Sequence, residues 1–172
     1  MEFKDFNFIE AKNILNSAGI ANPDRVVKLI SKTLHLLDID LTDLTVLTEA
    51  ASGPYVVTPI IASLAGAKHV YALTRDSQFA TIQQVIDQTR ALETLCGVQN
   101  KIEIMTERHP DLFSQADIVT NLGFVRPIDK ALIQVMKPEC VIPLMFESWE
   151  FRSNDLDLDA CHRYGITVAG TN

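Results

Sequence analysis

Short runs of β-branched residues alternate with helical patterns from Leu41 to the end of the chain. Such alternation is typical of βαβ units around a parallel sheet, and it therefore predicts an α/β fold. Strands are predicted at Leu44 to Thr48, His69 to Thr74, Lys101 to Thr106, Ile118 to Asn121, Cys140 to Met145 and Ile166 to Ala169. Helices are predicted at Tyr55 to Ala65, Phe79 to Cys96, Ile128 to Met136 and Leu156 to Tyr164, and only a short link, ERHPDLFSQA, is expected between the third and fourth strands. Right-handed crossovers favour a doubly wound sheet of strand order 3-2-1-4-5-6, whose ligand crevice lies at the carboxyl ends of strands 1 and 4.

The first 40 residues have a different pattern, with two amphipathic segments and no strand signal. FIEAKNILNSAG spaces apolar residues along one face of a helix, which Gly19 is predicted to end. In NPDRVVKLISKTLHLLDI, Asn22 can cap a second helix and Pro23 suits its first position. The apolar stripe of this helix is formed by Val26, Val27, Ile30, Leu34 and Leu37. Residues 1–40 are expected to form a helical arm packed on one domain of residues 41–172.

Composition excludes several classes of function. The net charge is −7 and no basic stripe is present, so we expect no nucleic-acid partner. No segment reaches the about 18 consecutive apolar residues of a membrane helix, and the N-terminus has no basic region followed by an apolar run, which predicts a cytoplasmic protein without a membrane partner. Cys96, Cys140 and Cys161 lack CxxC spacing and are interpreted as reduced, buried thiols. No histidine has a second ligand at metal spacing, so no metal site is expected.

The turn after the first predicted strand, TEAASGPY, has small residues where nucleotide-binding turns have glycines. Ala51 and Ser52 are small, Gly53 has an unrestricted φ, and the following helix presents its N-terminal amides and dipole to a ligand. Glu49 is unusual here, because a carboxylate would repel a diphosphate unless it bonded a ribose or the helix amides, and an acid/base role is equally open. Glu49, Ala51, Ser52, Gly53 and Tyr55 are the first candidate cofactor-binding residues.

This turn resembles those of two families. TEAASGPY is similar to the TGxxxGxG turn of short-chain dehydrogenases, with Glu49 and Tyr55 in place of two glycines. That family's catalysis is excluded because no tyrosine is followed four places on by lysine. The stretch from Val46 to Glu107 also resembles motif I and its surroundings in class I methyltransferases, which implies S-adenosylmethionine as an alternative ligand. Thr74 stands where that family's ribose-binding acidic residue should be, with Asp76 two residues later.

The second half carries the broader resemblance. ADIVTNLGFVRPIDKALIQVMKPECVIPLM is similar to the distal half of the cofactor-binding domain in D-2-hydroxyacid dehydrogenases and S-adenosylhomocysteine hydrolases, and the matching positions are Ala116, Asp117, Ile118, Met136, Lys137 and Pro138. DACHRYGITVAGT resembles the helix and sixth strand of the same domains. The resemblance covers about Leu44 to Thr171 and implies a Rossmann-like fold that binds NAD or NADP. Because those dehydrogenases have a separate catalytic domain, none of their catalytic residues is assigned to this chain. The chain is expected to be an oxidoreductase-like module, or else an interaction protein that has lost its ligand.

Further candidates follow the other strands of the predicted sheet. After the second strand, Arg75 with the hydroxyls of Thr74 and Ser77 favours the 2′-phosphate of NADP, whereas Asp76 would favour the ribose of NAD. After the fourth strand, Asn121 can hydrogen-bond a ligand and Gly123 lets it approach. The candidates for holding a substrate or partner are Arg126, Glu147 and Trp149. Since the sequence stops at Gly170-Thr171-Asn172, a homodimer using the N-terminal helices or the Phe146 to Phe151 loop is expected to cover the crevice.

Overall fold

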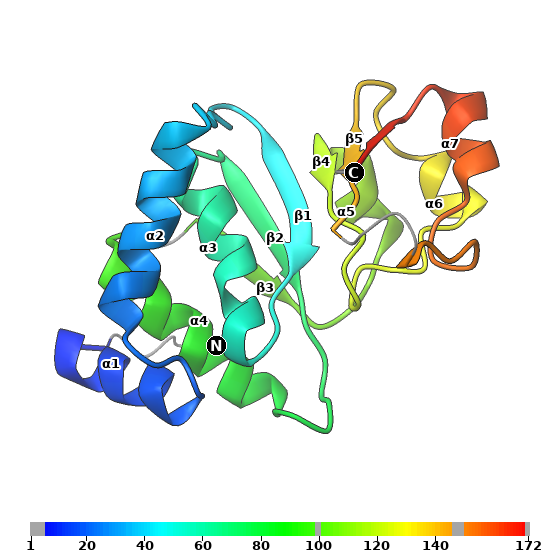
Figure 1. The fold of residues 1–172 in the computed structure, drawn as a ribbon. Helices are drawn as coiled ribbons and strands as arrows, with labels where there is room; N and C mark the ends of the chain where they lie inside the picture. The colour runs from blue at the N-terminus through cyan, green and yellow to red at the C-terminus, as the bar shows by residue number, and fades with distance from the viewer. Residues whose placement is uncertain (1–5, 99–100, 146–149, 171–172) are drawn as a thin grey trace.

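The computed structural model describes residues 6–98, 101–145 and 150–170. Six parallel strands form one sheet of order β3-β2-β1-β4-β5-β6 (Figure 1), which confirms the predicted α/β class and doubly wound topology. The strands are β1 Thr45–Glu49, β2 His69–Leu73, β3 Ile102–Met105, β4 Ile118–Val119, β5 Val141–Pro143 and β6 Thr167–Ala169. Each lies within or close to its predicted range, but β4 is shorter than expected. Asn121 lies beyond its end, and the Asn121 side chain accepts a hydrogen bond from the backbone N–H of Met145.

The helices form two layers on opposite faces of the sheet. Figure 1 shows α1–α4 on one side of the strands and α5–α7 on the other. The first layer contains α1 Phe8–Ser17, α2 Pro23–Leu36, the 3₁₀ helix η1 Gly53–Val56, α3 Val57–Leu64 and α4 Ile82–Cys96; the second contains α5 Pro110–Gln115, α6 Lys130–Ile133 and α7 Leu158–Tyr164. Adjacent residues of β1 point to opposite faces of the sheet. Val46 packs in the core under the first helix layer, and Leu47 packs in the core under the second layer.

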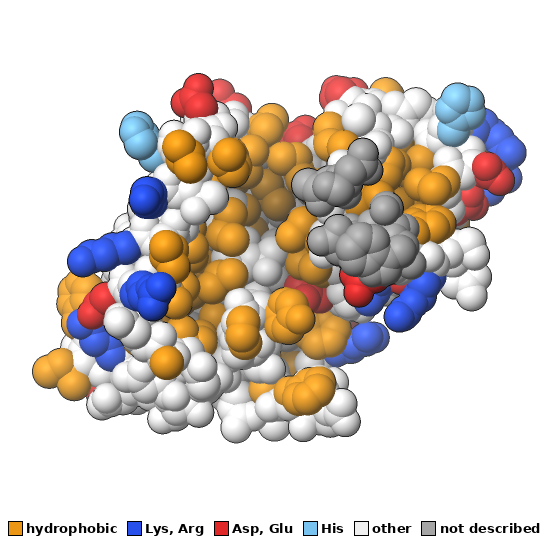
Figure 2. Space-filling view, viewed as in Figure 1, with side chains coloured by type: hydrophobic (Ala, Val, Ile, Leu, Met, Phe, Trp, Pro, Cys, Tyr) orange, Lys and Arg blue, Asp and Glu red, His pale blue; other side chains and the backbone are white. Residues whose placement is uncertain are grey.

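The N-terminal helices have the caps that the sequence indicates. Asn7 and Glu10 form a capping box on α1, and Asn22 caps α2 with Pro23 at the first helical position. Leu15 of α1 is fully buried in the core next to α4, whereas α2 is largely exposed. In Figure 2 the region of α2 carries apolar and basic side chains side by side. The predicted stripe of α2 is wrong at Leu37, which is 61% exposed because it follows the last helical residue.

The segment predicted as a short link between the third and fourth strands contains a helix. α5 begins at Pro110, and its cap His109 accepts a hydrogen bond at Nδ1 from the backbone N–H of Asp111. Phe113 is fully buried in the core between the sheet and the second helix layer, and this burial stabilises a helix too short to form alone. Other predicted helices begin or end two or three residues away; for example, α4 begins at Ile82, after its cap Thr81, rather than at Phe79.

Three further properties of the described residues bear on function. Within them, no helix combines the length and the hydropathy needed to cross a membrane. The same residues contain no cluster of three or more His, Cys, Asp or Glu side chains arranged for a metal ion. All three cysteines are free, and burial raises the pKa of the Cys140 thiol to about 12 and that of Cys161 to about 11, so both thiols are protonated at neutral pH.

Candidate functional site

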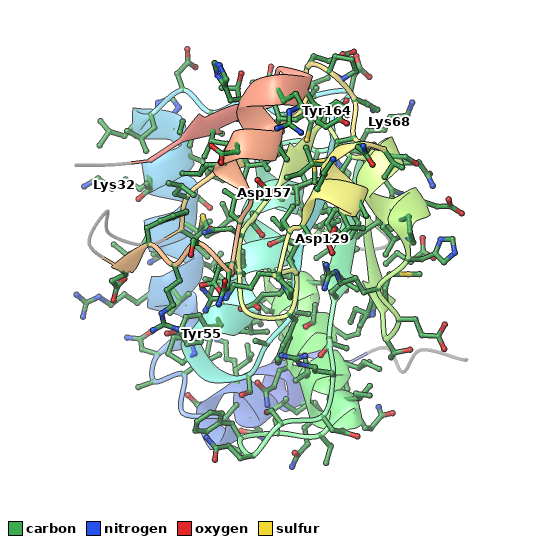
Figure 3. The ribbon with its side chains drawn as sticks, turned by 90° about the vertical axis from the view of Figure 1, so that its right-hand side faces the viewer. Lys32, Tyr55, Lys68, Asp129, Asp157 and Tyr164 are labelled. Carbon is green, nitrogen blue, oxygen red and sulfur yellow. The ribbon has the colours of Figure 1, made fainter. Side chains whose placement is uncertain are left out.

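A polar cavity of about 320 Å³ lies where β1, β4 and β5 end, at the point where the strand order reverses. It is lined by Glu49, Tyr55, Asn121, Leu122, Gly123, Arg126, Met145, Glu150 and Arg152. Figure 3 labels Tyr55, just past the carboxyl end of β1, well away from Lys68, which precedes β2 at the opposite edge of the sheet. In doubly wound folds ligands bind at this carboxyl edge, in the crevice between the two halves.

Glu49 spans this crevice. It is the last residue of β1, it is only 6% exposed, and its Oε2 accepts a hydrogen bond of 2.8 Å from the backbone N–H of Phe124 in the loop after β4. Burial raises the pKa of the Glu49 carboxyl, although the Phe124 N–H and the positive charges of Arg126 and Arg75 oppose the shift. Glu49 therefore bonds the opposite loop rather than the helix amides of its own turn, and its neutral form is favoured more than that of an exposed glutamate.

Asn121 has a buried hydrogen-bond donor beside the cavity. It is 1% exposed, and its Oδ1 accepts a 2.8 Å hydrogen bond from the N–H of Met145, which ties the end of β5 to the loop after β4. This bond assigns the amide orientation, so the Nδ2 group is the remaining donor. In the described part of the chain Nδ2 has no partner. Because a buried donor without an acceptor is costly, this amide is suited to bind a ligand atom.

Two arginines give the same edge its positive charge. Arg126 lines the cavity, and its Nη1 lies 2.7 Å from Oδ2 of Asp155. Arg75, just after β2, places its guanidinium 5.0 Å from the centre of the Phe124 ring, with Nη2 3.5 Å from the carbonyl oxygen of Gly123. Both loops around Glu49 thus carry a guanidinium that can meet an anionic group.

The turn after β1 is partly occupied by the protein's own side chains. Gly53 has φ +62°, a left-handed conformation that favours glycine, and its N–H donates a 3.2 Å hydrogen bond to Oε1 of Gln88 on α4. By contrast, the Ala51 and Ser52 N–H groups donate to no group among the residues that the structure describes. The free anion-binding amides of this turn are therefore those before Gly53, not that of Gly53 itself.

The segment after β2 is organised by its own hydrogen bonds. Asp76 Oδ1 accepts from the N–H of Ile82 at 2.8 Å, and Ser77 Oγ accepts from the N–H groups of Phe79 and Ala80, which keeps both side chains at the start of α4. Thr74 is buried, and over the described ranges its hydroxyl has no hydrogen-bond partner.

The structure brings five of the predicted residues to one cavity, namely Glu49, Tyr55, Asn121, Gly123 and Arg126. Ser52 and Gly53 line a neighbouring cavity, which Tyr55 also borders. Thr74, Asp76 and Ser77 line neither of these two, and Glu147 and Trp149 lie outside the described residues. Sequence reasoning missed Gln88, Phe124 and Arg152; only Arg152 had a signal, since it closely follows the FESWEF segment.

Comparison with known proteins gives a fold and no family. No protein-family model matches the chain, and no curated protein matches it. Among solved structures, shikimate 5-dehydrogenase from Listeria monocytogenes, in complex with shikimate and NAD, aligns with a TM-score of 0.54 at 12% identity over 86% of this chain and 52% of that chain.

The chain has a Rossmann-type fold. A dipicolinate synthase chain from Bacillus halodurans is also similar, with a TM-score of 0.49 at 14% identity, over 96% of this chain and 50% of that chain. Shikimate dehydrogenase from Aquifex aeolicus has a TM-score of 0.47 at 15% identity, over 87% of this chain and 49% of that chain. This chain spans about half the length of these solved chains. The likeness to the Listeria enzyme supports the Rossmann fold but not specifically the D-2-hydroxyacid dehydrogenase or S-adenosylhomocysteine hydrolase family.

Proposed function

We propose that this protein binds a nicotinamide dinucleotide at the carboxyl edge of its sheet and acts as the cofactor-binding module of an oxidoreductase. The observation that carries the proposal is the polar cavity at the switch point, where the buried Asn121 amide lies beside Arg126 and Glu49. In doubly wound folds this crevice is where a dinucleotide crosses from one half of the sheet to the other.

The polar groups around the cavity match the parts of such a ligand. Outside the lining of this cavity, in the turn after β1, the amides of Ala51 and Ser52 can donate to the diphosphate, and Arg126 adds a positive charge from the cavity itself. Asn121 Nδ2 can donate to a ribose or carboxamide oxygen. Glu49 can accept from a ribose hydroxyl, and its raised pKa lowers the cost of placing an acidic group near a diphosphate.

NADP is the preferred form in this proposal. Asp76 is the carboxylate that would hold the ribose hydroxyls of NAD, but its Oδ1 accepts from the backbone of Ile82 at the start of α4. Arg75 is exposed beside it, and its guanidinium is free of any carboxylate partner among the described residues. A guanidinium is suited to a 2′-phosphate, which it can bind with two parallel hydrogen bonds.

Thermal-shift and calorimetric titrations with NADP, NAD, S-adenosylmethionine and S-adenosylhomocysteine test the proposal. A ligand at about 100 times its Kd stabilises the folded state by about 2.7 kcal/mol, which is readily measured. Stabilisation by either nicotinamide dinucleotide supports the proposal. Stabilisation only by the S-adenosyl compounds would favour the methyltransferase-like alternative, and no shift with any of them would reject nucleotide binding.

Arg75→Ala tests the preference for NADP. The substitution is expected to weaken NADP by about 1.5–3 kcal/mol, the size of one charged hydrogen bond, and to leave NAD nearly unchanged. Arg25→Ala is the matched control, because Arg25 is an exposed arginine on α2 and lines neither cavity described above. An equal loss for both cofactors would mean that Arg75 acts by holding the loop after β4 through Phe124 and Gly123.

A further inference from the structure

A second cavity, of about 450 Å³, shares Tyr55 as a lining residue with the polar cavity. It is enclosed by the end of α1, by η1, by the loop after β2 and by α4, which contribute Ala18, Gly53, Phe79 and Gln88. Its volume is within the range of small-molecule sites, roughly 300–1,000 Å³. Because Tyr55 lines both cavities, the two lie next to each other.

Two exposed aromatic side chains border this second cavity. Phe79 is 79% exposed, and Tyr55 is also largely exposed. A phenylalanine is not held at such exposure by packing in the core. Aromatic side chains beside a cavity are a common means of binding the flat faces of nucleotide bases.

The interior of the cavity offers both a donor and an acceptor. Gln88 is only 8% exposed, and the bond from Gly53 N–H to its Oε1 assigns its Nε2 group as the remaining donor. Across the described ranges Nε2 has no hydrogen-bond acceptor. The carbonyl oxygen of Ala18, at the end of α1, borders the same space, 3.9 Å from where a Cβ on Gly53 would lie. Carbonyls at a helix C-terminus lack helical partners and can accept from a ligand.

Of the residues that the structure describes, those that line this cavity carry no positively charged side chain. Its described lining residues include no lysine or arginine, and the C-terminal end of the α1 dipole is negative. The polar cavity has charged side chains instead, Arg126 and Arg152 together with Glu49 and Glu150. A ligand with one neutral, flat end and one charged end therefore matches the two cavities in a single orientation.

We propose that the second cavity holds the 6-aminopurine base of a nucleotide whose charged part lies in the polar cavity. Phe79 covers one face of the base, Gln88 Nε2 donates to a ring nitrogen, and the carbonyl of Ala18 accepts from the exocyclic amino group. The inference deepens the proposed function and rests on it for the identity of the ligand as a nucleotide. It makes α1 part of the ligand site.

Calorimetric titrations with adenosine, nicotinamide mononucleotide and NADP test this assignment in three variants. Phe79→Ala removes the aromatic face from an exposed position, so the fold should be unaffected. Gln88→Glu keeps an acceptor for the Gly53 N–H and removes the donor. Phe8→Ala is the matched control, because Phe8 is an exposed phenylalanine of α1 that does not line the cavity.

Phe79→Ala and Gln88→Glu are each expected to weaken adenosine and NADP about tenfold or more, while nicotinamide mononucleotide binding stays unchanged in both. Phe8→Ala should leave all three ligands unchanged. Binding of NADP and adenosine that neither variant weakens would overturn the base assignment and leave the proposed function standing. Adenosine binding lost in both variants, in a protein that binds no dinucleotide, would support the base site and reject the proposed function. If the wild-type protein binds none of the three ligands, both are rejected.

Discussion

Glu49→Ala is expected to lower the free energy of unfolding by about 1–3 kcal/mol, whereas Glu49→Gln is not. The carboxylate accepts the N–H of Phe124 at 2.8 Å and is nearly buried, so alanine leaves that N–H without its acceptor at a half-buried site. Charged hydrogen bonds contribute about 1.5–3 kcal/mol, but removing a buried carboxylate also recovers part of its desolvation cost. Glutamine keeps an oxygen for Phe124 and removes the charge.

The difference between wild type and Glu49→Gln should depend on pH in a defined direction. Since burial raises the pKa of Glu49 in the folded protein above its ordinary value of 4.5, the folded state binds the proton more tightly than the unfolded state does. The corresponding stabilisation is fully present below pH 4.5 and is lost as the pH rises through the raised pKa. The wild-type protein should therefore lose stability relative to Glu49→Gln over that interval.

Urea unfolding at constant ionic strength, at about pH 4.5 and about pH 8, measures this difference. Glu107→Gln is the control, because Glu107 is an exposed carboxylate in the loop after β3. If the wild type gains stability relative to Glu49→Gln as the pH rises, the attribution of the pKa shift to burial is wrong. If alanine and glutamine cost the same, the bond to Phe124 contributes nothing measurable.

Two further substitutions address the turn and the amino edge of the sheet. Gly53→Val is expected to lower the free energy of unfolding, measured in urea, by about 1–2 kcal/mol, because Gly53 has a left-handed φ of +62°. The added Cβ itself has space, since it meets only the Ala18 carbonyl oxygen at 3.9 Å. The same substitution should abolish stabilisation by nucleotides. Unchanged nucleotide binding would place the ligand elsewhere. Asp117 accepts from Lys137 Nζ at 2.6 Å and from the Thr45 N–H at 2.7 Å; burial alone would raise its pKa, but these partners outweigh burial and lower it below 3.8. The ionised Asp117 stabilises the folded state at neutral pH, and this stabilisation is lost as the pH falls through the lowered pKa. Asp117→Asn should therefore lower the thermal midpoint at neutral pH and reduce the dependence of the midpoint on acid. An unchanged midpoint would contradict this.

Much of the fold could be predicted because it depends on local pattern. Val46 and Leu47 are consecutive apolar residues, which is typical of a strand buried on both faces, and the structure places them in different core clusters. Asn22 and Pro23 mark the start of α2 in sequence as they do in the structure. α5 was missed because its six residues give too short a periodic signal, and its stability depends on burying Phe113 in the second layer.

The predicted strand order was enough to indicate which candidate residues share one edge, because parallel strands have their carboxyl ends together. Glu49 and Asn121 could therefore be placed near each other without coordinates. The hydrogen bonds that these side chains make could not be predicted in this way. Glu49 accepts a hydrogen bond from a backbone N–H 75 residues away in the sequence. Gln88 lies in no turn or motif, yet it accepts a hydrogen bond from the N–H of Gly53, 35 residues before it. Local pattern carries no information on such pairs, because each depends on the direction in which a loop leaves its strand and on which distant side chain then fills the space.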